Sequence, residues 1–122
     1  MLLAAYPQLF VGDIDAVCAF YDQKLGFATV FKYGRPAFYA QVRRDGATLN
    51  LRHVDTPLVD TIQREREVYL SAYIPVKDIE ALYGEYVGRA VDFQERLVVK
   101  PWGVREFVVR DPDGNLICFG ST

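Results

Sequence analysis

The pattern of apolar and polar positions occurs twice along the chain. Residues 11–21 read VGDIDAVCAFY and residues 76–86 read VKDIEALYGEY, so most positions match at a constant spacing of 65 residues, from Val11 to Val76. In both copies an aspartate precedes apolar residues that recur every three or four positions. This pattern predicts a helix capped by Asp13 or Asp78, with one apolar stripe facing a core. The stripe residues are Ile14, Val17, Cys18, Tyr21 and Leu25 in the first copy and Ile79, Leu82, Tyr83, Tyr86 and Ala90 in the second.

Short apolar segments on both sides of these helices predict strands. Each copy also has a hairpin signal, Asp45-Gly46 in the first and Asp111-Pro112-Asp113-Gly114-Asn115 in the second. Each copy therefore has one strand, one helix and three further strands. The expected strands include residues 6–11, 28–32, 48–51, 70–76, 92–99 and 116–119. Two βαβββ modules predict an α+β fold of curved mixed sheets with the helices on the convex side.

The length of 122 residues suits one domain, because half of the chain is too short to form a core of its own. We expect a single domain over residues 1–122, with module one at about 1–54, a linker at about 55–68 and module two at about 69–122. The linker carries the charged run Arg64-Glu65-Arg66-Glu67, which is typical of a solvated connector.

Strand alternation predicts which side chains lie under the helices and which lie on the opposite, concave face. The residues expected under the helices are Phe38, Ala40, Val42, Ala47, Leu49 and Leu51, with Leu70, Ala72, Ile74 and Val76 in module two. Those expected on the concave face are Tyr39, Gln41, Arg43, Thr48, Asn50 and Arg52, with Ser71, Tyr73 and Pro75. A face carrying aromatic and amide groups favours a ligand surface, and Tyr6, Tyr39 and Tyr73 strengthen that interpretation. The alternatives are a solvated face and a face buried against the other module.

Charge and composition exclude several classes of partner. Sixteen acidic and fourteen basic residues give a net charge of −2, which predicts no binding to nucleic acid or to an anionic membrane. The apolar start, Met1 to Ala5, has no basic residue and is too short to span a bilayer, so we expect neither a signal peptide nor a membrane anchor. Cys18 and Cys118 lie in apolar surroundings, which indicates free buried thiols and a cytoplasmic protein.

Several motifs together resemble the vicinal oxygen chelate superfamily, which includes glyoxalase I, extradiol dioxygenases, fosfomycin resistance enzymes and bleomycin resistance proteins. They are Phe20-Tyr21, Leu25-Gly26-Phe27, Asp45-Gly46 and the run from Arg110 to Asn115. Pro101-Trp102-Gly103, Arg105-Glu106-Phe107 and Pro7 are more similar to the bleomycin resistance branch. That resemblance implies the glyoxalase/bleomycin resistance fold and a homodimer in which the N-terminal strand crosses to the partner subunit.

The resemblance also implies where a metal would be bound. Enzymes of the superfamily use four His or Glu ligands, two from each module, and the matching positions here are Tyr6, Asn50, Ser71 and Cys118. None of these is a usual ligand in such a set. The one histidine, His53, is out of phase with Asn50 and Arg52, so we expect it to be structural. We therefore predict no metal, no other cofactor and no catalytic residue.

The leading hypothesis is a metal-independent binding protein of the bleomycin-resistance type. It would sequester a planar or aromatic organic ligand, such as an antibiotic, in a groove at the dimer interface. Trp102 would be the main stacking surface, with a core position as the alternative for its indole. The predicted ligand-binding residues are Trp102, Tyr39, Tyr73, Gln41, Asn50, Arg52, Phe31 and Tyr6. The alternative function is a metal-dependent lyase, isomerase or dioxygenase of the same superfamily.

Overall fold

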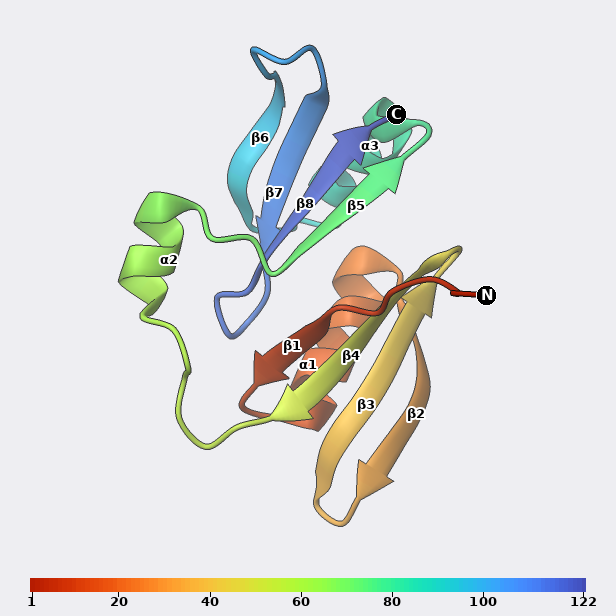
Figure 1. Ribbon diagram of the computed structural model, residues 1–122, viewed down its shortest axis with the longest axis vertical. Coiled ribbons are helices and arrows are strands. Elements are labelled where there is room, and N and C mark those ends of the chain that lie inside the picture. Colours follow the sequence, from red (N-terminus) through yellow and green to blue (C-terminus); the bar gives the residue numbers. More distant parts are fainter.

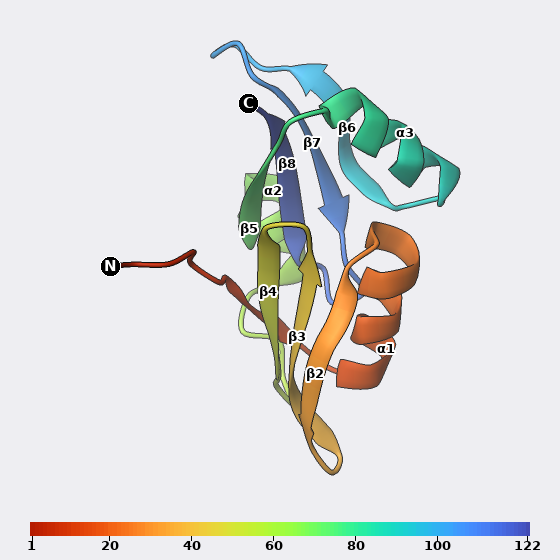
Figure 2. The same cartoon turned by 90° about the vertical axis from the view of Figure 1, so that its right-hand side faces the viewer.

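The computed structural model describes residues 1–122 and contains two four-stranded sheets with helices along one side (Figures 1 and 2). Module one consists of β1 (Gln8–Val11), α1 (Ile14–Phe20), the π-helical turn η1 (Tyr21–Leu25), β2 (Ala28–Gly34), β3 (Ala37–Arg44) and β4 (Ala47–His53). A short helix, α2 (Thr61–Glu67), follows. Module two consists of β5 (Ala72–Val76), α3 (Ile79–Gly88), β6 (Phe93–Val99), β7 (Arg105–Arg110) and β8 (Leu116–Ser121).

The two sheets have the same topology. Their strand orders are β1-β4-β3-β2 and β5-β8-β7-β6, and in each sheet the first pair is parallel and the other two are antiparallel. Figure 2 shows α1 and α3 on the same side of the two sheets. The prediction of an α+β fold from two βαβββ modules is confirmed.

Local sequence signals account for the helix of each module, α1 and α3. The carboxylate of Asp13 accepts a hydrogen bond from the amide of Ala16 at 3.1 Å, and Asp78 caps α3 in the same way. All five stripe residues of the first copy are buried. Ala90 was predicted to belong to the apolar stripe of the second helix. This prediction was wrong, because α3 ends at Gly88 and Ala90 is exposed with a φ of +56°.

The predicted division of the sheet faces holds at the strand centres. Ala40, Val42, Leu49, Leu51 and Ala72 are buried in one core cluster that spans both modules, and Ala47, Ile74 and Val76 pack against it. Two predictions were wrong. Phe38 is half exposed because the β2–β3 hairpin extends past the end of α1 (Figure 2), and Leu70 is exposed because it precedes β5.

The linker is more than a solvated connector. Asp60 caps α2 by accepting from the amide of Ile62 at 2.9 Å. Arg64 donates to the Asn115 side chain at 2.9 Å, and Glu65 forms an ion pair with Arg110. The first two residues of the predicted charged run therefore attach α2 to module two. None of the three α-helices has the length and apolar content needed to cross a membrane.

Candidate functional site

Five of the predicted ligand-binding residues lie on the face of β2, β3 and β4 that points away from the helices, which we call the outward face. Gln41 and Asn50 are opposite each other in the sheet, and the Gln41 amide donates to Asn50 Oδ1 at 3.0 Å. Tyr39 is opposite Arg52, and its ring centroid lies 5.8 Å from that of Phe31. We call Phe31, Tyr39, Gln41, Asn50 and Arg52 the module-one face. It combines aromatic surface with amide and guanidinium groups, which suits a flat polar ligand.

The corresponding face of module two includes Tyr73, on the edge strand β5. Its strand neighbour in the parallel pair is Cys118, and Glu106 lies opposite Gly120 in the next pair. Burial raises the pKa of the Tyr73 hydroxyl, and the nearby Glu106 carboxylate raises it further. Burial and Glu106 likewise raise the pKa of the Cys118 thiol to about 12, so this thiol is protonated at neutral pH, as expected of a packing residue.

Trp102 and Tyr6 are not brought against the module-one face within one chain. Trp102 lies in the turn between β6 and β7, at the end of its sheet that is far from module one (Figure 1). Its exposed fraction of 66% excludes the core position considered for it. Tyr6 precedes β1 and is also exposed, and neither ring pairs with another aromatic ring of the chain.

A cavity of about 830 Å³ lies between the two modules, and sequence reasoning did not predict it. Its walls come from the β3–β4 turn, β5, α3 and the segment before β1. Of the predicted residues only Tyr73 lines it. The other lining residues include Arg44, Thr48, Pro75 and Glu85. No periodic signal could reveal such a cavity, because its walls are far apart in the sequence.

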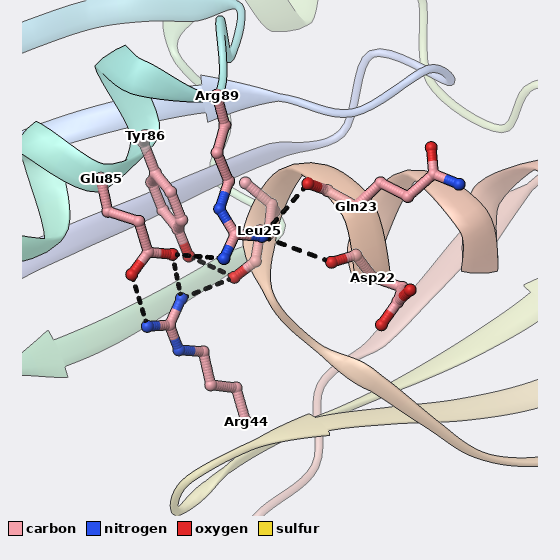
Figure 3. Close-up of polar contacts among 7 residues, drawn as sticks. All are labelled: Asp22, Gln23, Leu25, Arg44, Glu85, Tyr86 and Arg89. Atoms are coloured by element: carbon pink, nitrogen blue, oxygen red, sulfur yellow. Dashed lines mark hydrogen bonds and ion pairs between the residues drawn. The ribbon is translucent and has the colours of Figure 1, made fainter.

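Polar side chains at the rim of this cavity clasp the modules together (Figure 3). The Arg44 guanidinium donates to both carboxylate oxygens of Glu85, at 2.7 and 2.8 Å, and to the Leu25 carbonyl at 3.0 Å. The Tyr86 hydroxyl donates to the same carbonyl at 2.8 Å, and Arg89 lies 3.2 Å from Glu85. The hydrogen bond from Arg44 lowers the pKa of Glu85, and burial raises that of Tyr86. These groups bind one another, so we interpret them as structural.

The Asp-Pro-Asp-Gly-Asn turn forms a second clasp. The buried Tyr21 hydroxyl donates to the Asp111 carboxylate at 3.0 Å, and the Gly12 amide donates to Asp113 at 2.8 Å. Asn115 donates to the Phe10 carbonyl at 3.1 Å. Tyr21 corresponds to Tyr86 in the repeat, and each donates its hydroxyl to the other module. The turn therefore joins the modules and takes no part in either outward face.

The residues at the implied metal positions do not fit a catalytic metal. Asn50 and Cys118 lie on strands, and their parallel partners are Gln8 and Tyr73. Tyr6 and Ser71 precede the strands, and Ser71 donates to Asn115 at 3.1 Å. An amide and a protonated thiol are poor ligands for the ions that His and Glu sets bind. No group of three or more His, Cys, Asp or Glu side chains in the structure has the arrangement of a metal site.

His53 is held by neighbours on both sides of its ring. Nδ1 lies 2.8 Å from the Gly12 carbonyl oxygen, and Nε2 lies 2.8 Å from Asp55 Oδ1. Asp55 first, and then the carbonyl, raise the pKa of His53. Both ring nitrogens have protein partners, which supports the structural role expected from the sequence.

Comparison with known proteins identifies the family. The model of the Glyoxalase/Bleomycin resistance protein/Dioxygenase superfamily matches residues 4–119. The chain belongs to this superfamily. The match confirms the resemblance seen in the motifs, and it covers both modules of the superfamily fold.

One solved structure supports the bleomycin resistance branch, and two others show the same fold. A bleomycin-binding protein from bleomycin-producing Streptomyces verticillus, complexed with copper(II)-bleomycin, is 30% identical over 100% of this chain and 98% of its own, with a TM-score of 0.77. A bleomycin resistance determinant encoded on the transposon Tn5 shares the fold at 19% identity over 99% of this chain and 98% of its own, with a TM-score of 0.81. A bleomycin-binding protein complexed with bleomycin also shares the fold, at 21% identity over 99% of both chains, with a TM-score of 0.79. No curated protein matches the chain by sequence.

Proposed function

We propose that this chain is a metal-independent binding protein of the bleomycin-resistance type, which sequesters a planar or aromatic organic ligand in a groove at a dimer interface. The observation that carries the proposal is the module-one face, where two aromatic rings lie beside a hydrogen-bonded amide pair on an open sheet. The 30% identity with a bleomycin-binding protein over the full length supports the same function. The rings would stack on the ligand, and Gln41, Asn50 and Arg52 would orient it through hydrogen bonds.

The chemistry of the two faces favours binding over catalysis. The Cys118 thiol is protonated at neutral pH and no histidine contacts it, so it has no means of activation as a nucleophile. The amide pair is suited to directional hydrogen bonds with a neutral polar group. A protein with these groups protects by holding its ligand rather than by changing it.

A second copy of the chain would complete the groove. The segment Met1–Tyr6 extends away from the two sheets (Figure 2), and Leu2 and Leu3 have exposed fractions of 96% and 86%. Pro7 separates this apolar arm from β1. Covering the arm with a partner subunit would remove its apolar surface from water. The groove would then place Trp102 of one subunit near the partner's module-one face. Buried free thiols at Cys18 and Cys118 support a reducing, cytoplasmic setting.

The test is a calorimetric titration of the protein with metal-free bleomycin, with and without a chelator. We expect saturable binding of one ligand per subunit, unchanged by the chelator, together with quenching of Trp102 fluorescence. Trp102→Ala should weaken binding by about fivefold or more, since one stacking contact contributes about 1 kcal/mol. Tyr69→Ala, which removes an exposed ring beside α2, is the matched control and should leave affinity unchanged. About one tightly held transition metal per chain, with loss of stability on chelation, would support the enzyme alternative instead.

A further inference from the structure

The sheet of module one has basic residues and no acidic ones. Strands β1 to β4 contain no aspartate or glutamate, although the chain has sixteen acidic residues. Their lysine and arginine residues are Lys32, Arg43, Arg44 and Arg52. Lys32 and Arg44 form ion pairs with acidic residues of α1 and α3. Arg43 and Arg52 alternate with core positions of their strands and therefore give the outward face of module one a positive charge.

Arg52 has no partner for its guanidinium within the chain. It takes part in none of the ion pairs, and every side-chain hydrogen bond from an arginine comes from another position. Its side chain is exposed, and in the sheet it lies between Tyr39 on β3 and Phe10 on β1. A free guanidinium can donate two parallel hydrogen bonds to one carboxylate. Arg52 is therefore available to an anionic group from outside the chain.

A chain of hydrogen bonds fixes the direction of the amide pair on the same face. Arg43 donates to the Thr48 hydroxyl at 3.0 Å and to Gln41 Oε1 at 3.4 Å. Because a guanidinium can only donate, Gln41 turns its oxygen toward Arg43 and its amide nitrogen toward Asn50 Oδ1. Each amide oxygen thus already accepts a hydrogen bond, and the NH2 group of Asn50 has no partner in the chain. The free groups of Asn50 and Arg52 are both donors, which suits a ligand that offers acceptors.

We propose that Arg52 and Asn50 form an anion subsite of the ligand-binding groove, which takes a carboxylate attached to a flat aromatic ring. This inference rests on the proposed function and adds a negatively charged group to the ligand. Arg52 supplies the positive charge and two parallel donors, and Asn50 donates from its NH2 group. The rings of Tyr39 and Phe31 stack on the aromatic part of the ligand. No acidic residue on β1 to β4 repels the carboxylate.

The test compares two flat ligands of the same shape, 2-naphthoate and 2-naphthamide, of which only the first is charged at neutral pH. Their affinities for the wild-type protein, Arg52→Gln and Arg66→Gln are measured by NMR titration. The wild-type protein should bind 2-naphthoate about tenfold more tightly than 2-naphthamide. Arg52→Gln should weaken 2-naphthoate binding about tenfold and 2-naphthamide binding less than about twofold, because only the carboxylate forms charge-assisted hydrogen bonds. Arg66→Gln removes the same charge from the exposed surface of α2 and should change neither affinity more than about twofold.

A second variant tests the subsite without removing the charge. Arg52→Lys keeps the charge but loses the planar fork, so its affinity for 2-naphthoate should lie between those of the wild-type protein and Arg52→Gln. The melting temperature of Arg52→Gln should match that of the wild-type protein, since the exposed guanidinium has no partner to lose. Equal effects of Arg52→Gln on both ligands, or equal affinities of the wild-type protein for both, would overturn the subsite and leave the proposed function standing. Failure of both ligands to bind the wild-type protein would count against the subsite and the proposed function together.

Discussion

The ion pair between Arg44 and Glu85 should contribute measurably to the clasp that holds the two modules together (Figure 3). The perturbation is a double-mutant cycle with Arg44→Met and Glu85→Gln. Both side chains are less than one third exposed, and the pair is bidentate, at 2.7 and 2.8 Å. Exposed pairs contribute about 0.2–1 kcal/mol, whereas removing one partner of a fully buried pair costs about 3–5 kcal/mol. For this intermediate burial we expect a coupling energy of about 1–2 kcal/mol.

The assay is urea unfolding of the four proteins at neutral pH, repeated in acid. Arg44→Met should be the more costly single change, because it also leaves the Leu25 carbonyl with one donor fewer. Arg44 lowers the pKa of Glu85 in the folded protein below its ordinary value of 4.5. The coupling is therefore fully present above pH 4.5 and should disappear as the pH falls through the folded-state pKa.

The matched control is the cycle for Arg66 and Glu67, an exposed pair with an N–O distance of 3.4 Å. Its coupling energy should be close to zero. A coupling for Arg44 and Glu85 no larger than that of the control, or one that persists unchanged in acid, would refute the conclusion that this pair clasps the modules.

Three further predictions follow from exposure and hydrogen bonding. Trp102→Ala should lower the free energy of unfolding by no more than about 1.5 kcal/mol, because this side chain is 66% exposed, whereas loss of a core tryptophan costs about 3–5 kcal/mol. A larger loss, measured by urea unfolding, would show that the indole belongs to the core. Iodoacetamide should not label Cys118 in the folded protein at pH 8, since its pKa is about 12, and rapid labelling detected by mass spectrometry would contradict this. NMR titration should give His53 a pKa above 6.5, and this pKa should fall in Asp55→Asn. The stabilisation from the contact between His53 and Asp55 should be fully present below pH 6.5 and lost as the pH rises through the folded-state pKa. An unchanged His53 pKa in the variant would refute the role of Asp55.

Local patterns were sufficient to predict most of the fold. The Asp13 and Asp78 caps depend on residues three positions away, and the burial of Val42 or Leu51 depends only on strand alternation. The same alternation predicted the residues of the module-one face, because residues paired across antiparallel strands, such as Gln41 and Asn50, lie on the same side of the sheet. These features needed no knowledge of how the modules are arranged.

Contacts between distant segments could not be predicted in this way. Arg44 and Glu85 are 41 residues apart, and nothing in either local pattern indicates that they pair. Ala90 was misplaced because periodicity does not show where a helix ends.

The central claim, ligand sequestration by a dimer without a protein-bound metal, is tested most directly by native mass spectrometry. The measurement uses protein freed of metal with a chelator and mixed with metal-free bleomycin. We predict a dimer carrying two ligand molecules and no metal ion. A monomer without ligand, or a complex that forms only after a transition metal is restored to the protein, would contradict the proposed function.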